Sequence, residues 1–442
     1  MHTRKQCVSG RSRSHHKTTK ELRFIVFLSV LMASPWALRA EGKHRVETIK
    51  LNNGFEVAFV KSKKSPLVTV QSWYRAGSKH TDEKNRGAAY AVAALQNSGS
   101  KHLRPGSRNQ IIENLGGKQR FTVAEDATVF STTLANSYLE LIMKLEAERL
   151  EHLFVDKRRL QLELEALPAY GVHHTNNGVR MATEAFVQNV FAGTEYKNSV
   201  RVTKPDLNKL KAQDVIGFYR RRYLPEHGLL IVVGNFEKST VENMVKKYFG
   251  DKKSGTTSKK QKGGFAKNKI FNDSKTNDLG HVIALEGIRM PNRGFKANLG
   301  LHVLAEVLGV GNGSLLYQKS LDPNFKKKLL FAKVLQREHA SLFLMGADVM
   351  DESSLEAYMK LKKELYSELS EKELPKTVLE RAKQRLRSQH RFATESSEGK
   401  ATALGEFWIR YHEAIHPNEY FETLKSIDVG VIKNLAKDAL PI

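Results

Sequence analysis

Apolar and polar residues follow two rhythms along the chain from Val46 onward. Residues 46–60 (V-E-T-I-K-L-N-N-G-F-E-V-A-F-V) alternate on both sides of the turn at 52–54, which predicts a β-hairpin. Residues 68–74 and the continuous apolar run at 229–234 predict two further strands. Apolar residues at helical spacing predict helices, which lie at about 87–97, 107–115, 136–152, 156–170 and 239–249.

The same order of elements restarts after a polar segment. Residues 251–264 (D-K-K-S-G-T-T-S-K-K-Q-K-G-G) contain no apolar anchor and predict a basic, flexible linker. Beyond the linker, the pattern predicts strands at 281–289 and 340–349, a helix at 296–308 before a turn at 309–314, and charged helices near 353–370 and 375–392. Two α/β domains, 41–250 and 265–442, explain this weak duplication better than one sheet. The second domain stops at Ile442, where a last strand is expected.

The first 40 residues have a different composition. Seven Lys or Arg residues up to Arg23 precede the apolar run 24–33, and a small residue stands at Ala40. This order predicts a signal peptide over 1–40 and a periplasmic location. The apolar run is short for a membrane span, but Leu38 is not ideal for cleavage, so an uncleaved inner-membrane anchor stays open. The single cysteine, Cys7, lies in this leader, so the remaining chain offers no disulfide, thiolate zinc site or cysteine nucleophile.

The net charge is strongly positive. The leader carries +7 of the formal charge of +25, which leaves +18 on the rest of the chain. Such an excess is compatible with nucleic acid, anionic membranes or acidic partners. Its even spread and the predicted export argue against nucleic acid. We interpret it as a solvated surface with some affinity for an anionic envelope surface.

Short motifs occur in a constant order over nearly 400 residues. They are W73-Y-R-A-G-S78, Gly87, G116-G117, D126-A-T128, L145-E-A-E-R149, the run F218-Y-R-R-R-Y-L-P-E-H-G-L-L-I-V-V-G234, L308-G-V-G-N-G-S-L-L-Y-Q318 and L379-E-R-A-K383. Together they resemble the insulinase/pitrilysin metallopeptidases, the inverted zincins with an H-x-x-E-H helix. The resemblance implies an α+β fold with two homologous α/β roll domains, each a mixed or antiparallel sheet flanked by helices, of the LuxS/mitochondrial-processing-peptidase-like type.

In that family, zinc is held by the two histidines and by a glutamate about 70–80 residues further on, and the motif's glutamate is the general base. Carried over to this chain, the first His falls on Tyr90, the base on Ala93 and the second His on Ala94. The third ligand falls on Tyr170, with Glu163 at an earlier structural glutamate. Aligning Glu165 with the ligand instead restores only one donor. Alanine has no donor atom and a phenol is a poor zinc ligand, so the resemblance implies a site with neither zinc nor catalytic residues.

No replacement site is evident in the sequence. His173 and His174 are adjacent, and adjacent side chains on a helix diverge by roughly 100°, so we interpret them as surface histidines. His80, His102 and His152 show no ligand spacing. The chain has no G-x-S-x-G motif and no Ser/His pair that could be nominated for nucleophilic catalysis.

The peptide-binding positions are also altered. In the family, the strand after the Gly-Gly turn offers its edge to an extended peptide. The matching segment here is Arg120, Phe121, Thr122 and Val123. The second domain of the family supplies an Arg and a Tyr that grip the substrate, and these align with Asp322 and Phe331.

The sequence therefore indicates an exported, non-catalytic insulinase-family subunit or peptide-binding scaffold without a cofactor. Members of the family enclose peptides in a four-domain chamber, so the resemblance implies two such chains. The expected partner is an H-x-x-E-H homologue or a second copy of this chain, with extended peptides bound between them. Two alternatives stay open. One is an active zinc metalloendopeptidase with a displaced ligand set, and the other is an envelope-associated binding protein without a peptidase partner.

Overall fold

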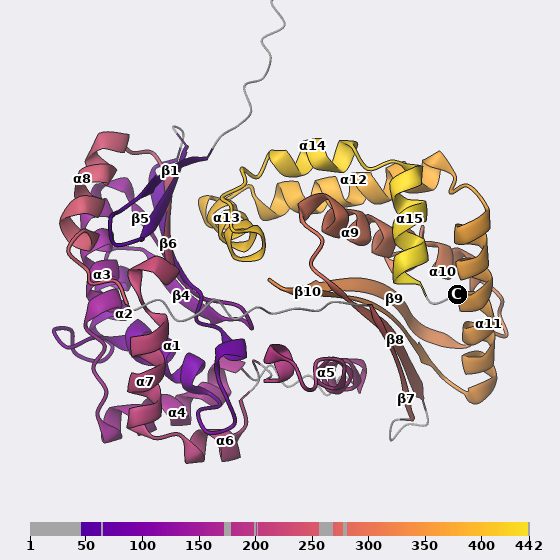
Figure 1. Ribbon diagram of the computed structural model, residues 1–442, viewed down its shortest axis with the longest axis horizontal. Coiled ribbons are helices and arrows are strands. Elements are labelled where there is room, and N and C mark those ends of the chain that lie inside the picture. The colour runs from indigo at the N-terminus through magenta and orange to yellow at the C-terminus, as the bar shows by residue number, and fades with distance from the viewer. Residues whose placement is uncertain are drawn as a thin grey trace, which may run out of the picture. The chain divides into compact units, whose positions relative to one another are not determined.

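The computed structural model describes residues 46–62, 65–171, 178–198, 200, 202–255, 268–276 and 281–440. The predicted signal peptide, residues 256–264 of the predicted linker, and His173 and His174 lie outside these ranges. Strands and helices alternate around two separate sheets (Figure 1). The chain is thus of the α+β class.

Six of the described strands form the first sheet, in the order β1-β2-β6-β3-β5-β4. All neighbours are antiparallel except β2 and β6, and β1 and β2 form the predicted hairpin. The strands are β1 (Glu47–Lys50), β2 (Glu56–Lys61), β3 (Leu67–Tyr74), β4 (Lys118–Val123), β5 (Thr128–Ala135) and β6 (Gly228–Gly234). The helices of this half are α1 (Ala88–Ser98), α2 (Ser107–Asn114), α3 (Leu139–Glu151), α4 (Lys157–Gly171), α5 (Gly178–Val190), α6 (Lys204–Lys209), α7 (Ala212–Arg222) and α8 (Lys238–Phe249).

Four described strands form the second sheet, which is antiparallel throughout in the order β7-β8-β10-β9. They are β7 (Lys269–Thr276), β8 (Val282–Pro291), β9 (Lys327–Gln336) and β10 (Ala340–Val349). The helices are α9 (Phe295–Gly309), α10 (Leu315–Lys319), α11 (Glu352–Glu371), α12 (Lys376–Ala393), α13 (Ser397–Tyr411), α14 (Glu419–Lys425) and α15 (Val429–Ala439). None of the helices described here is both long and apolar enough for a membrane span.

Each half lends one helix to the sheet of the other half. All seven residues of β6 are buried, and since alternate side chains of a strand point to opposite faces, this sheet has to be covered on both faces. Helices α1, α3, α7 and α8 cover one face, and α13 from the second half covers the other (Figure 1). The contact joins Ala401, Leu404, Trp408 and Ile409 of α13 to Trp73, Leu229, Ile231 and Val233.

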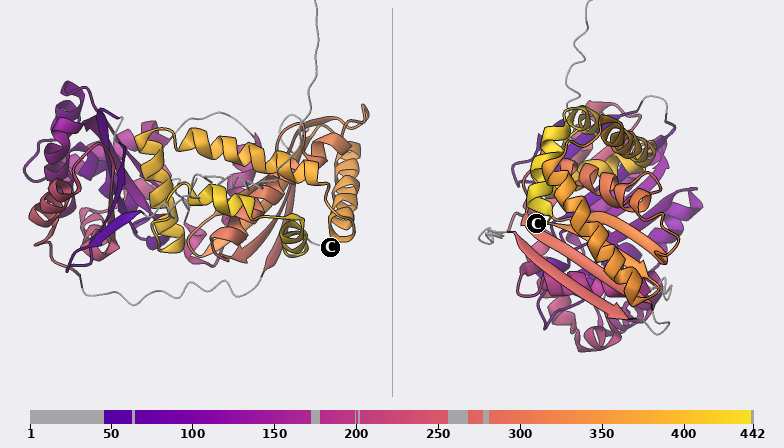
Figure 2. Two further views of the ribbon diagram at one scale, coloured as in Figure 1. Left: turned by 90° about the horizontal axis from the view of Figure 1, so that it is seen from above. Right: turned by 90° about the vertical axis from the view of Figure 1, so that its right-hand side faces the viewer.

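The second sheet is covered in the reciprocal way by α5. Phe186 and Val190 of α5, with Phe191 and Tyr196 just beyond it, pack on Ile283, Leu285, Leu342 and Leu344 of β8 and β10. Figure 2 shows the earlier and the later colour ranges gathered around different sheets, and Figure 1 shows the magenta α5 beside the orange strands of the second sheet. The pattern of apolar residues predicted neither α5 nor α13. This exchange joins the two halves through their hydrophobic cores.

Candidate functional site

The segment that carries the predicted zinc motif is the buried helix α1. Ala93 and Ala94 are 0% and 2% exposed, and Tyr90 is partly buried. The small side chains of Ala93 and Ala94 let neighbouring elements approach α1 closely. The Tyr90 ring meets the ring of Phe121 on β4 edge to face, with centroids 5.7 Å apart.

An apolar cluster fills the space beside Ala94. We call it the plug, and its members are Tyr90, Ala94, Phe121, Leu164, Val202 and Leu207. The only side-chain heteroatom among these described residues is the phenol oxygen of Tyr90. A catalytic zinc ion takes three protein ligands with N, O or S donors. The described members of the plug therefore do not supply the donor set of a catalytic zinc ion.

Helix α4 runs past α1 with its later residues nearer the start of α1. The Arg159 guanidinium donates to the carbonyl of Leu95 (2.7 Å), and Leu164, further along α4, packs against the buried pair of Ala94 and Leu207. Leu164 is thus the described α4 residue in the plug, and the neighbouring Glu163 is half-buried. The side chain of Tyr170 lies outside the described part of the chain, so its match to the third zinc ligand stays a prediction.

The predicted peptide-binding segment lies on an edge strand. Strand β4 pairs with β5 on one side, and no other described strand pairs with its second edge. Phe121 and Val123 face the helical core, whereas Arg120 and Thr122 are exposed on the opposite face. The Arg120 Nε donates to Glu398 Oε1 of α13 at 2.6 Å. The second half therefore orients one side chain of this edge.

The other two predicted peptide contacts take part in local packing. Asp322 is exposed and closes the turn before β9, where its carboxylate accepts from Asn324 N at 2.9 Å. Phe331 on β9 packs against the cluster that holds α5 and lies close to Gly346. The substrate-gripping positions stay a prediction.

Arg75, in the motif at residues 73–78, and the following Lys79 form a buried ion network between the halves with Asp126 and Glu338. The Lys79 ammonium contacts Asp126 Oδ1 at 2.7 Å and also pairs with Glu338, which lies between β9 and β10. The Arg75 guanidinium meets the second oxygen of Glu338 at 2.6 Å. Gly77 is required here because a Cβ would lie 2.2 Å from the carbonyl oxygen of Glu125. We call Arg75, Lys79, Asp126 and Glu338 the junction network.

The junction network is closed by hydrogen bonds. Tyr196 OH donates to Asp126 Oδ1 (2.8 Å), and the Glu338 N–H donates to Asp126 Oδ2 (3.0 Å). Burial alone would raise the pKa of Asp126, but Lys79 and these donors hold it below the usual value. Burial raises the pKa of Tyr196 far above its usual range, which keeps the phenol a donor. Two cations thus balance two carboxylates, and the segment that contains the motif W73-Y-R-A-G-S78 forms part of a structural junction.

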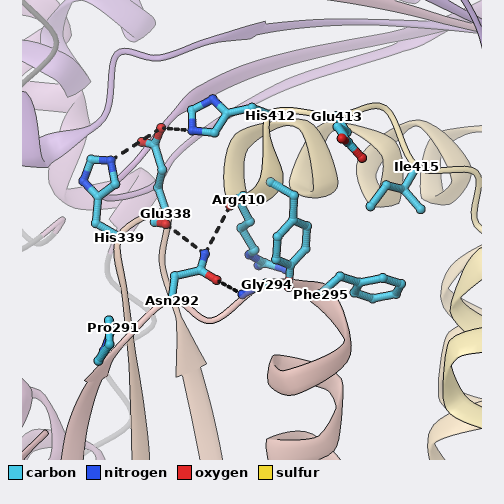
Figure 3. A pocket seen from close by; sticks show the side chains of 11 residues that line it. Pro291, Asn292, Gly294, Phe295, Glu338, His339, Arg410, His412, Glu413 and Ile415 are labelled. Atoms are coloured by element: carbon cyan, nitrogen blue, oxygen red, sulfur yellow. Dashed lines mark hydrogen bonds and ion pairs between the residues drawn. The ribbon is translucent and has the colours of Figure 1, made fainter. Parts of the chain in front are cut away.

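A cavity of about 520 Å³ adjoins the junction network (Figure 3). Glu338 stands between two histidines, with His412 Nε2 at 3.4 Å and His339 Nε2 at 3.8 Å from Glu338 Oε1. Asn292 donates to the carbonyl oxygens of Glu338 (2.8 Å) and Arg410 (3.1 Å). The sequence gives no signal for this cavity because its lining comes from three separate segments, 291–295, 338–339 and 410–415. The lining residues are Pro291, Asn292, Gly294, Phe295, Glu338, His339, Arg410, Tyr411, His412, Glu413 and Ile415.

Two histidines that had no evident pattern come together in space. His102, Glu148 and His152 each offer a ligand atom, and these atoms lie within 4.8 Å of one another. No other such group of three occurs within the ranges that the structure describes. Part of the signal is visible in the sequence, since Glu148 and His152 are one helical turn apart.

Comparison with known families fits this architecture. Residues 56–204 match the family described as Insulinase (Peptidase family M16), and residues 209–386 match the one described as Peptidase M16 inactive domain. The chain belongs to the insulinase family. The resemblance inferred from the short motifs is thereby confirmed.

Two similar zinc proteases align with most of the chain, and a third relative aligns with a little under half of it. The zinc protease PqqE of Helicobacter pylori is 23% identical over 396 residues, 87% of this chain and 88% of that protein. An uncharacterized zinc protease of Rickettsia bellii is 18% identical over 395 residues, 88% and 94% of the two chains. Cytochrome b-c1 complex subunit 1 from bovine mitochondria is 24% identical over 202 residues, 45% of this chain and 42% of that protein.

Two solved structures of the family share the fold. The crystal structure of a protease from Helicobacter pylori superposes with a TM-score of 0.77 at 20% identity, over 90% of this chain and 97% of that one. The peptidase M16 inactive domain from Pseudomonas fluorescens superposes with a TM-score of 0.75 at 15% identity, over 90% and 96%. The predicted fold class is confirmed.

Proposed function

We propose that this chain is a non-catalytic insulinase-family subunit that binds extended peptide beside an H-x-x-E-H peptidase. The plug carries this proposal. Peptide hydrolysis by a zinc enzyme needs a metal-bound water and a base that accepts its proton. Ala93 and Ala94, at the predicted positions of the base and of a ligand, have only methyl groups, and Phe121 and Leu164 enclose this part of α1.

Peptide binding does not need those residues. The second edge of β4 presents backbone N–H and C=O groups, which pair with an extended chain whatever its side chains are. Arg120 and Thr122 on the exposed face are suited to acidic and polar side chains of such a peptide. The association with a second protein is supported by one relative, cytochrome b-c1 complex subunit 1, which by its name is a subunit of a complex. We also propose that the chain is exported to the periplasm and can contact an anionic envelope surface there.

The hydrolytic part is tested with the purified full chain and a library of fluorogenic peptides. We expect no cleavage with added zinc and no effect of a chelator. The triple variant Tyr90→His/Ala93→Glu/Ala94→His also stays inactive, because Leu164 and Phe121 occupy the space beside the motif. Chelator-sensitive cleavage by the unmodified chain would instead identify an active endopeptidase with other ligands.

The partner is tested by affinity purification of the tagged chain from the periplasm of its source. We expect an H-x-x-E-H homologue to co-purify, and peptide cleavage by that homologue to increase when this chain is added. A chain that elutes alone and binds anionic vesicles would favour the envelope-binding alternative.

A further inference from the structure

Two histidines and a glutamate converge where α3 ends. Glu148 lies in the last turn of α3, His152 follows its last residue, and His102 lies in the turn between α1 and α2. We propose that His102, Glu148 and His152 bind one divalent transition-metal ion, with zinc as the best match. This site is separate from the plug and does not depend on the proposed function.

The donor atoms already face one another. His102 Nδ1 lies 3.0 and 3.2 Å from the two carboxylate oxygens of Glu148, and His152 Nε2 lies 3.8 Å from Glu148 Oε2. The two imidazole rings are edge to face with centroids 4.6 Å apart. Ligands around a tetrahedral zinc ion, with bonds of about 2.1 Å, are separated by roughly 3.4 Å. Metal binding therefore needs only small side-chain movements.

The backbone holds the three residues in place without a metal. The Lys101 N–H donates to the carbonyl of His152 at 2.9 Å, which ties the turn to the end of α3. Ser100 N donates to the Leu103 carbonyl at 3.0 Å and closes that turn. The Ser100 hydroxyl donates to Glu148 Oε1 at 2.5 Å and orients the carboxylate. Metal ligands in proteins are commonly oriented by such outer hydrogen bonds.

The donor set indicates the class of metal. Two imidazole nitrogens with one carboxylate oxygen suit zinc and its neighbours, whereas calcium and magnesium require more oxygen ligands. The Glu148 side chain is 19% exposed and the histidines are more exposed, so water can complete the coordination. The C-terminal end of α3 also carries partial negative charge, which favours a cation.

Two further charged groups stand next to the cluster. Glu151 Oε2 lies 3.5 Å from His152 Nε2 and also pairs with Lys252. The Glu151 carboxylate offsets the charge of Lys252, so the lysine does not oppose a bound cation. The metal would link the turn after α1 to the end of α3, at the opposite end of α1 from Tyr90.

The experiment is an isothermal calorimetric titration of the chelator-treated full chain with zinc chloride. We expect one strong site per chain, and affinity at least tenfold weaker in His102→Ala, His152→Ala and Glu148→Gln. Zinc should raise the melting temperature of the unmodified chain but not that of His102→Ala. With cobalt, the unmodified chain should show the intense visible bands of a tetrahedral nitrogen-ligated site.

Two controls test other histidines. The double variant His173→Ala/His174→Ala removes the adjacent pair. His412→Asn removes an exposed histidine that directly follows α13. Both should bind zinc like the unmodified chain. The proposal is wrong if the chain binds no zinc, if zinc binding survives His102→Ala and His152→Ala, or if it is lost in the His173/His174 variant. Circular dichroism checks that each variant is folded. The cobalt spectrum is measured on the unmodified chain, so it tests the site even if a variant does not fold.

Discussion

At the scale of single residues, the buried polar groups have two different roles. The junction network pairs every charge, and its members come from both halves of the chain. The plug has the opposite character, since it consists of closely packed apolar side chains with one phenol oxygen. Charge in a protein interior is tolerated only when it is paired, whereas methyl groups need only space. Substitutions at the two places should therefore fail for different reasons.

Lys79→Met is predicted to destabilise the chain by about 3–5 kcal/mol, because it leaves Asp126 and Glu338 buried beside each other without the shared cation. Urea unfolding measures the change. Lys425→Met breaks an exposed pair with Glu422 and should change the free energy of unfolding by less than about 0.5 kcal/mol. Equal effects of the two substitutions would contradict the structural role of the network.

Ala94→His is predicted to lower the free energy of unfolding by about 1–3 kcal/mol, because the imidazole has to displace Leu207 or Leu164 from a filled space. Thermal and urea unfolding test this. Thr122→His adds the same group on the exposed face of β4 and serves as the control. A gain in stability of Ala94→His on adding zinc, absent from the control, would show that the plug can accept a metal ligand.

Burial on α9 lowers the pKa of His302 to about 4, assisted by the positive charge of Arg410. In the unfolded chain its pKa is near 6.5, so the unfolded state takes up the proton first as the pH falls. The free energy of unfolding should therefore decrease between pH 6.5 and pH 4, by on the order of 3 kcal/mol. In His302→Gln, urea unfolding across this range should show a flatter dependence. An unchanged slope would assign the pH dependence to other groups.

At the scale of elements, α13 depends on a glycine. Gly405 lies in this helix opposite Trp73 of β3, and a Cβ on it would lie 1.9 Å from Trp73 Cε2. Glycine in a helix interior normally costs about 1 kcal/mol relative to alanine. Here that cost allows the helix to lie flat on the first sheet.

Gly405→Ala should therefore destabilise the chain by about 1–3 kcal/mol, although it improves the intrinsic helix propensity. Gly430→Ala in α15 is the matched control, since the nearest atom to its Cβ is Asp428 Oδ1 at 3.3 Å and the residue is exposed. The control should be neutral or stabilising. Thermal unfolding of both variants compares them, and two stabilised variants would refute the close packing of α13 on Trp73.

At the scale of the whole molecule, the exchange of α5 and α13 makes the halves interdependent. Each helix covers apolar strand residues of the other half, and the junction network adds paired charges. A half separated from its partner would expose the sheet face that the exchanged helix covers. Exposed apolar surface of that kind promotes aggregation.

A protease site inserted between residues 256 and 264 provides the test. After cleavage, the two fragments should co-elute in size-exclusion chromatography and separate only in denaturant. Each fragment expressed alone should be insoluble or self-associate. Two soluble, monomeric fragments would show that the exchanged helices contribute little to stability.

Much of the fold was predictable because periodic patterns are local. The hairpin of β1 and β2, the helix α1 and the long helices α11 and α12 lie within a few residues of the positions predicted from apolar spacing. The motifs around Arg75 and Asp126 indicated the family, but they did not predict the ion network that these residues form. A sequence motif shows which residues are present but not which residues they contact in the folded chain.

The sequence by itself determined the family and the two-sheet α+β class, and it predicts that Tyr90, Ala93 and Ala94 stand at the zinc-motif positions. Only the tertiary structure decided that Lys79 is paired with Glu338, that α5 and α13 exchange sheets, and that His102 meets Glu148 and His152. The physical reason is sequence separation. Helical and strand periodicity arises between residues a few positions apart, whereas these contacts join segments 46 to more than 300 residues apart and leave no periodic signal.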